Sequence, residues 1–175
     1  MSEPLSPDQG TTPSEPPIAI RSQYIKDFSF ENPNAPGILA DIKGPPRINV
    51  QVDVQTHPMG PNTFEVILVI RAQAMAGEKT MFVVDLTYGG VFVLTNVPQN
   101  LVGPVLLIEA PRLLFPFARA IVCDATRDGG FPPLFISPID FAQLYQQKVA
   151  QLQAAQAQNT PGSVPPVPTG PVGHA

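Results

Sequence analysis

Apolar and polar residues alternate through the first half of the chain in a pattern that predicts β-strands. In the clearest case, every second residue from Ile48 to Val54 is aliphatic, as expected for a strand with one buried and one solvated face. Three other segments alternate over similar lengths, and turns rich in Pro or Gly separate them. The predicted strands are Ser22–Phe30, Arg47–Gln55, Thr63–Ala74 and Lys79–Leu94.

The first strand is predicted to have one aromatic and one acidic face. Strict alternation places Tyr24, Lys26, Phe28 and Phe30 on one side, and Ile25, Asp27, Ser29 and Glu31 on the other. Such a strand can pack its aromatic side against an apolar layer and present carboxylates to a basic partner. The pattern therefore indicates a binding surface.

The fourth strand is apolar on both faces. Val83 lies on one side, whereas Phe82, Val84, Leu86 and Tyr88 lie on the other. If helices cover one face, the second is expected to meet another subunit or a ligand. The pair Gly89–Gly90 inside this strand predicts a bulge or a close backbone approach.

The second half of the chain favours helices. Residues 100–108 predict a short helix, and helical spacing of apolar residues from Pro111 onward predicts a longer one that ends near Gly129. A last helix is expected with Ser137 as N-cap and Pro138 at its first position. Its predicted apolar stripe is Phe141, Tyr145, Val149 and Leu152. Strands followed by helices predict an α+β fold, with a four-stranded antiparallel sheet and two main helices packed on one face.

Composition limits the function classes. The chain has 175 residues, a net charge of −4 and a charged fraction of 14%, so we expect no nucleic-acid binding, which requires a basic stripe. The predicted organisation is an N-terminal extension (1–17), one domain (18–155) and a Pro/Gly-rich tail (156–175). We identify no signal peptide and no apolar stretch long enough to span a bilayer, so we expect a cytoplasmic protein without membrane insertion.

Residues with catalytic potential are few. The two histidines, His57 and His174, fall in a predicted turn and in the tail, and neither has a nucleophile or orienting partner nearby. The single cysteine, Cys123, is predicted to pack in a helix. Two carboxylates, Asp27 and Glu31, are too few for a calcium site. We therefore expect no enzyme activity, no cofactor and no metal site, although a small-ligand enzyme on a sheet-and-helix scaffold stays an alternative.

Three segments together resemble one known family. They are YIKDFSFENPNAP (24–36), GEKTMFVVDLTYGGVF (77–92) and APRLLFPFARAIVCDATRDGGFPPLFISPIDFAQLY (110–145). In this order and spacing they resemble the bacterial protein-export chaperones of the SecB family, over roughly Ile18 to Leu152. The resemblance implies a homotetramer built as a dimer of dimers, with the helix from Pro111 between dimers. It also implies that the chain holds unfolded precursor proteins without ATP and transfers them to the SecA ATPase.

The resemblance assigns residues to three surfaces. It implies a client groove formed by strand two, the Pro/Gly-rich loop from Asn32 to Pro46 and the last helix, with Ile48, Val50, Val52, Tyr145 and Val149 as candidate residues. It implies contact with SecA through Asp27, Glu31, Val83 and Asp85, and subunit contact through Val84, Leu86 and Tyr88. A general holdase of the same fold that does not serve SecA is the alternative within this fold.

Overall fold

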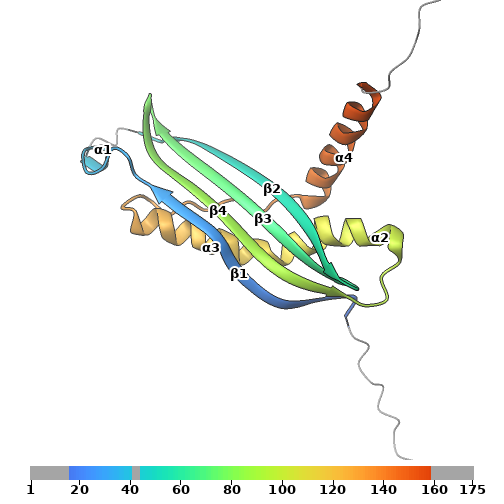
Figure 1. Ribbon diagram of the computed structural model, residues 1–175. Helices are drawn as coiled ribbons and strands as arrows, with labels where there is room; N and C mark the ends of the chain where they lie inside the picture. The colour runs from blue at the N-terminus through green and yellow to red at the C-terminus, as the bar shows by residue number, and fades with distance from the viewer. Residues whose placement is uncertain (1–15, 41–43, 159–175) are drawn as a thin grey trace, which may run out of the picture.

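The computed structural model describes residues 16–40 and 44–158 and contains the predicted strands-then-helices order (Figure 1). The strands are β1 (Ile18–Glu31), β2 (Arg47–Gly60), β3 (Thr63–Ala76) and β4 (Lys79–Leu94). The helical elements are α1 (Gly37–Ala40), α2 (Gln99–Pro104), the π-helical turn η1 (Val105–Glu109), α3 (Ala110–Asp128) and α4 (Phe141–Gln158). Most of the two predicted tails lies outside the described residues, and α4 continues three residues beyond the predicted domain boundary at 155.

The four strands form one antiparallel sheet in the order β1-β4-β3-β2. The β2–β3 turn is tighter than predicted: β2 continues to Gly60, and only Pro61 and Asn62 make the turn. Asn62 adopts a left-handed conformation with φ 54°, and Gly77 does the same at the β3–β4 turn with φ 61°. These tight turns set the register of the three consecutive strands β2, β3 and β4.

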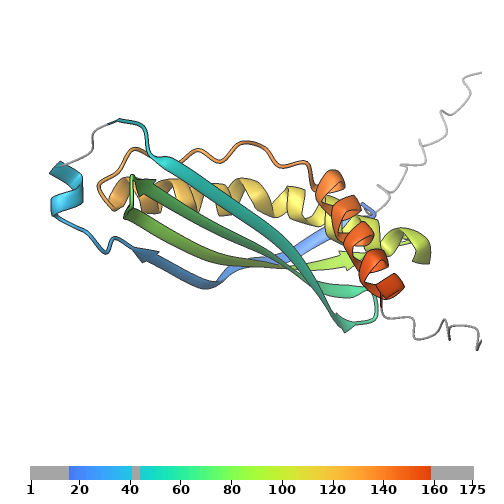
Figure 2. The same ribbon diagram turned by 90° about the horizontal axis from the view of Figure 1, so that it is seen from above.

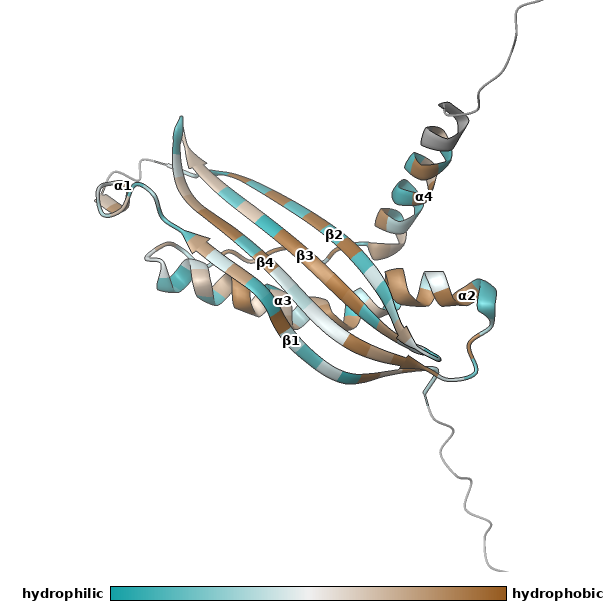
Figure 3. Cartoon of the chain, in the orientation of Figure 1, coloured by the Kyte–Doolittle hydropathy of each residue, from teal (hydrophilic) through white to brown (hydrophobic). Residues whose placement is uncertain are grey.

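Helix α3 runs along one face of the sheet, and we call this the inner face (Figures 1 and 2). Leu114, Ala118 and Val122 lie one turn apart on α3 and are fully buried in the core. Even-numbered strand residues supply the other half of this core, which explains the alternation of apolar and polar positions along β2 (Figure 3). The strand residues of the core, of which Met81 alone is odd-numbered, are Val54, Val66, Leu68, Ile70, Ala72, Ala74, Met81, Phe82, Val84, Leu86, Tyr88, Phe92 and Leu94.

The expectation that Val84, Leu86 and Tyr88 meet another subunit is wrong for their side chains. All three belong to the core of this single chain, with exposed fractions of 0%, 1% and 7%. The physical reason is that they lie on the inner face, beneath the helical layer. The alternation of residues correctly placed these three side chains on one face of β4. It could not show that this face is the one covered by the helices.

The glycine pair in β4 permits close approaches, one on each face. A Cβ on Gly89 would lie 2.7 Å from the Tyr24 ring, and a Cβ on Gly90 would lie 2.7 Å from Leu114. The expectation of close approach is confirmed. The pairing irregularities of this half of the sheet lie in β1, between Ile20 and Ser22 and between Ile25 and Asp27.

The irregularity at Lys26 changes the predicted faces of β1. Phe28 and Phe30 pair with Leu86 and Val84 and therefore point to the inner face, as predicted. Tyr24, however, pairs with Gly89 and reaches Glu65 on the opposite, outer face, where Lys26 joins it. The prediction that Tyr24 and Lys26 share a face with Phe28 and Phe30 is wrong, because the extra residue at Lys26 shifts the alternation by one position.

The two helices predicted for residues 100–128 form one continuous helix. The π-helical turn η1 joins α2 to α3, and Pro104 and Pro111 lie on either side of this turn. By length and composition alone, the helix Gln99–Asp128 is long and apolar enough to cross a membrane, a test that a buried core helix also passes. Helix α3 supplies Leu114, Ala118 and Val122 to the core of this chain.

Helix α4 starts later than predicted. Asp140, rather than Ser137, acts at its N-terminus: the Gln143 N–H donates to Asp140 Oδ1 over 3.0 Å, and the first helical residue is Phe141, not Pro138. Phe141 is buried against Phe115, whereas Leu152, at the far end of the predicted stripe, is exposed. Helix α4 packs on η1 and projects beside β2 (Figures 1 and 2).

Candidate functional site

The sheet brings the four candidate SecA-contact residues together on its outer face. In the β1–β4 register, Glu31 lies opposite Val83, Ser29 opposite Asp85, and Asp27 opposite Thr87. Paired residues of neighbouring strands point to the same side of a sheet, so these positions share one surface. Asp27 and Glu31 are exposed, and Val83 and Asp85 are half-buried. We call the set Asp27, Glu31, Val83 and Asp85 the acidic face.

The three carboxylates of the acidic face differ in their partners. Asp85 accepts a hydrogen bond from Arg71 Nε, across the β3–β4 pair. Within residues 16–40 and 44–158, no ion pair joins Asp27 or Glu31 to a basic side chain. The sequence alone did not pair Arg71 with Asp85. A register counted from the β3–β4 turn would place Arg71 opposite Val84, because the pairing shifts by one residue between Ala74 and Met75.

A second charged cluster occupies the outer face near the β2–β3 turn. Its centre is Glu65, whose Oε1 accepts hydrogen bonds from the Tyr24 hydroxyl over 2.5 Å and from Lys26 Nζ over 2.8 Å. His57 Nδ1 lies 3.6 Å from Glu65 Oε2. The hydrogen bond to Glu65 is the main cause that raises the pKa of Tyr24 to about 12, and the bond from Lys26 is the main cause that lowers the pKa of Glu65. The charged side chains of this cluster are paired with one another, whereas no ion pair within the described residues joins Asp27 or Glu31 to a basic side chain.

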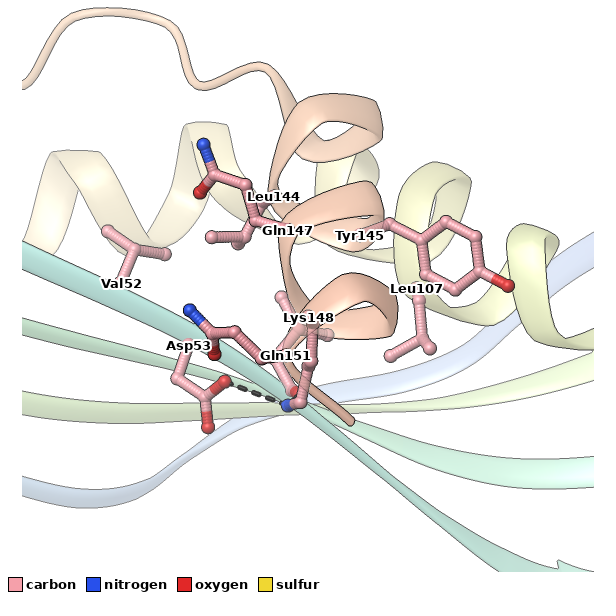
Figure 4. A pocket seen from close by; sticks show the side chains of 9 residues that line it. Val52, Asp53, Leu107, Leu144, Tyr145, Gln147, Lys148 and Gln151 are labelled. Carbon is pink, nitrogen blue, oxygen red and sulfur yellow. Dashed lines mark hydrogen bonds and ion pairs between the residues drawn. The ribbon is translucent and has the colours of Figure 1, made fainter. Parts of the chain in front are cut away.

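Three cavities lie along β2 within the described residues: one is lined by Gln51, Val52, Asp53, Val69 and Arg71 of the strands alone, and the other two also involve the helical half of the chain. Of these other two, the first, of about 210 Å³, opens between β2 and α4 (Figure 4). It is lined by Val52, Asp53, Val54, Leu107, Leu144, Tyr145, Gln147, Lys148 and Gln151. The second, also of about 210 Å³, is lined by Pro46, Ile48, Met81, Phe82, Phe131, Pro132, Pro133 and Leu134. We call this first and second cavity together the apolar groove.

An ion pair crosses the first cavity. Lys148 Nζ on α4 donates to Asp53 Oδ1 over 2.9 Å and to the Val54 carbonyl over 2.8 Å (Figure 4). Burial pushes the pKa of Asp53 upward, but the hydrogen bonds from Lys148 and Gln55 outweigh it and lower the pKa. Because Val54 lies in an edge strand, Lys148 also satisfies a carbonyl near the exposed edge of the sheet.

The predicted client residues fall around this groove in different ways. Val52 and Tyr145 line the first cavity, and Ile48, which is 43% exposed, lines the second. Val50 lies between them and packs partly against the core. Val149 is half-buried but lines neither cavity.

Sequence reasoning missed the second wall of the groove. Residues 131–134 leave α3 as an extended segment without regular structure, so no periodic pattern marks them. Leu107 was missed because it lies in the π-helical turn, and Leu144 because it falls beside the predicted stripe of α4. The run Phe131-Pro132-Pro133-Leu134, apolar yet unable to form a helix, was the available sign.

The other candidate residues show no arrangement for catalysis. His57 lies within β2 rather than in a turn, Cys123 is half-buried on α3, and His174 lies outside the described residues. In the part of the chain that the structure describes, no three His, Cys, Asp or Glu side chains are grouped to hold a metal ion. What the described surface offers instead is an apolar groove and an acidic face.

Comparison with known proteins agrees with this arrangement. The family model for the preprotein translocase subunit SecB matches residues 11–152. The chain belongs to the SecB family. The protein-export protein SecB of Azorhizobium caulinodans is 54% identical over 154 residues, which cover 88% of this chain and 92% of that protein. SecB of Agrobacterium fabrum is 52% identical, with 83% and 92% covered.

A solved structure supports the fold. The SecB-like chaperone of Mycobacterium tuberculosis, in complex with a ChAD peptide from the HigA1 antitoxin, superposes with a TM-score of 0.54. The two sequences are 15% identical, and the match covers 70% of this chain and 90% of the mycobacterial one. At this identity the likeness establishes the SecB α+β fold and nothing about ligands.

Proposed function

We propose that this protein is an ATP-independent export chaperone that holds unfolded precursor proteins and delivers them to the SecA ATPase. Membership of the SecB family supports the proposal. The observation that carries it is the presence of two chemically different surfaces on one sheet: an apolar groove along β2, and an acidic face on β1 and β4. A chaperone that holds one protein while it docks on another requires two separate binding surfaces.

The apolar groove is the proposed client site. The second cavity exposes mainly carbon, from Ile48, Phe82 and the segment 131–134, so it can hold an apolar side chain of an unfolded protein. Apolar contact is not directional and tolerates many sequences. Folded proteins bury the same side chains, and therefore the groove discriminates by folding state rather than by sequence.

The acidic face is the proposed SecA contact. Glu31 is exposed opposite Val83, and Asp27 is exposed on the same face opposite Thr87, so this face combines two carboxylates with an apolar side chain. Such a surface suits a basic segment, because opposite charge steers the approach and an apolar contact adds affinity. We propose that this chain has no metal, cofactor or catalytic role of its own.

We further propose that the chain acts in the cytoplasm as a homotetramer. The outward side of α3 supports an assembly, because Leu113 and Phe117 are 41% and 51% exposed on a helix whose other side is buried in the core. Several grooves in one assembly can hold one client at several points, which multiplies weak contacts through effective concentration.

The test is titration of the purified protein with an unfolded precursor and, separately, with SecA. We compare the wild type with Asp27→Ala/Glu31→Ala and with Ile48→Asp, which puts a charge into the second cavity. We expect the first variant to lose SecA only and the second to lose precursor only.

Two outcomes would change the assignment. If the wild type ignores unfolded precursor, the chain keeps the SecB fold without the chaperone activity. If all three proteins ignore SecA but the wild type binds precursor, the general holdase becomes the function.

A further inference from the structure

Arg71 is the one basic side chain that an ion pair joins to the acidic face within the described residues. It lies on β3 directly opposite Asp85 on β4, and its Nε donates to Asp85 Oδ1. The other cross-strand neighbour of Asp85 is Ser29 on β1, which carries no charge. Arg71 thus occupies the position that a cation from a docking partner would take.

This ion pair is open to exchange. The Arg71 side chain is 63% exposed and that of Asp85 is 31% exposed, so both groups remain accessible to water. Pairs of this kind stabilise a protein little, because solvent screens the charges and two flexible side chains lose freedom. A cation brought close by Asp27 and Glu31 can therefore displace Arg71 at small cost.

We propose that Arg71 competes with the basic segment of the docking partner for Asp85 and so weakens and tunes that contact. This inference rests on the proposed role of the acidic face. With Arg71 in place, the resting surface presents two unneutralised carboxylates instead of three, together with a repelling guanidinium. A contact of moderate strength suits a carrier, which must release its partner after each delivery.

The matched control is Arg47. It lies on the same outer face, opposite Met75 at the start of β2, and is exposed like Arg71. Within the described residues no ion pair involves Arg47. Arg47→Gln and Arg71→Gln change the net charge equally, so a difference between them reports the local competition for Asp85 and not long-range attraction.

The experiment measures binding of a synthetic Lys/Arg-rich peptide and, in a separate arm, of SecA. We expect Arg71→Gln to bind the peptide about two- to fivefold more tightly than the wild type, as loss of a surface ion pair allows. The gain should exceed that of Arg47→Gln, and the salt dependence should steepen because one more carboxylate takes part. Arg71→Lys keeps the competing charge, so its affinity should stay near that of the wild type.

A double-mutant cycle isolates the action through Asp85. In an Asp85→Asn background, Arg71→Gln should give no more gain than Arg47→Gln does. If Arg71 had only a structural role, Arg71→Gln would instead shift the unfolding midpoint, and the effects of the Arg71 and Asp85 substitutions on peptide affinity would be additive. Weaker peptide binding by Arg71→Gln would overturn the proposal, since Arg71 would then contact the partner itself.

The arms separate this inference from the proposed function. If the peptide affinities change as expected but SecA binds no variant, the competition between Arg71 and a basic segment for Asp85 is supported, and the proposed delivery to SecA is refuted. If SecA binding depends on Asp27 and Glu31 but Arg71→Gln and Arg47→Gln behave alike, delivery stands and the competition is refuted. Absence of peptide binding to both the wild type and Arg71→Gln also refutes it.

Discussion

At the residue scale, one buried hydroxyl fixes a wall of the apolar groove. Thr126 is the fully buried polar side chain of the described core. Its hydroxyl donates within α3 to the Val122 and Cys123 carbonyls, and its oxygen accepts from the Leu134 N–H over 2.9 Å. Leu134 lines the second cavity, so the hydrogen bond ties the extended segment to the helix.

We predict that Thr126→Val weakens both stability and client binding. The substitution keeps the shape but leaves the Leu134 N–H without its acceptor, at a cost of about 1–3 kcal/mol. Urea unfolding measures the loss, and titration with an unfolded precursor measures the effect on the groove. Thr126→Ser is the control, because it keeps the hydroxyl. Equal client binding by Thr126→Val and Thr126→Ser would show that the hydrogen bond does not shape the groove.

The cluster at Glu65 predicts a loss of stability at high pH. The pKa of Tyr24 is raised to about 12 from an ordinary value of 10.0, so the folded state holds this proton more tightly than the unfolded chain. Its contribution is fully present below pH 10 and is lost as the pH rises through 12. Unfolding free energies measured across this window should fall more for the wild type than for Tyr24→Phe. If the unfolding free energies of the wild type and Tyr24→Phe fell equally with rising pH, the hydrogen bond from Tyr24 to Glu65 would not be the cause of the loss.

At the scale of elements, the described side chains of α4 beyond Phe141 are half-buried or exposed, and Lys148 bonds the middle of the helix to the sheet. Lys148 bonds Asp53 and Val54 on β2, whereas the start of the helix is held by buried Phe141. Beyond Lys148 the described side chains are half-buried or exposed. The width of the first cavity is therefore controlled at Lys148.

We predict that Lys148→Met loosens α4 without unfolding the protein. Both partners of the ion pair are about half exposed, so the loss is expected to be at most about 1 kcal/mol. Hydrogen exchange should quicken in α4 and remain unchanged in β3 and β4. Lys79→Met serves as the control, because Lys79 is exposed and lies at the distant β3–β4 turn. Unchanged exchange in α4 would show that Phe141 alone holds the helix.

The elements also show which parts of this fold a sequence can predict. Strand alternation depends on neighbouring residues only, so all four strands and the inner-face residues of β2 were predicted. The shift at Lys26 was missed because no glycine or proline marks it. Two helices were predicted, the second from Pro111 onward, whereas the π-helical turn η1 joins them into one continuous helix.

The candidate sites were predictable to a different degree. Alternation within one strand was enough to put Asp27 with Glu31 and Val83 with Asp85, whereas the β1–β4 pairing that brings the two pairs together joins distant parts of the chain. The burial of Val84 could not be predicted, because it depends on which side of the sheet α3 covers. The wall formed by residues 131–134 depends on a hydrogen bond from Leu134 to Thr126, eight residues earlier, and this bond leaves no periodic pattern.

At the scale of the whole molecule, the outward side of α3 is the surface that a single chain leaves incomplete. Leu113 and Phe117 expose large apolar groups there, while the sheet already has its core on the inner face and polar groups on much of the outer face. Apolar area of this kind drives association, because its removal from water is favourable. Client binding through several grooves depends on that association.

We predict that Phe117→Asp dissociates the assembly and weakens binding of long clients much more than of short peptides. A buried charge at a subunit contact would be unpaired and costly, whereas the fold should persist because Phe117 lies outside the core. Light scattering measures the mass, and titration compares a full-length unfolded precursor with a peptide that fills one groove. Met59→Asp, an exposed position at the end of β2, is the control. Equal losses for the two ligands would mean that each groove acts alone, and an unchanged mass would place the subunit contact on another surface.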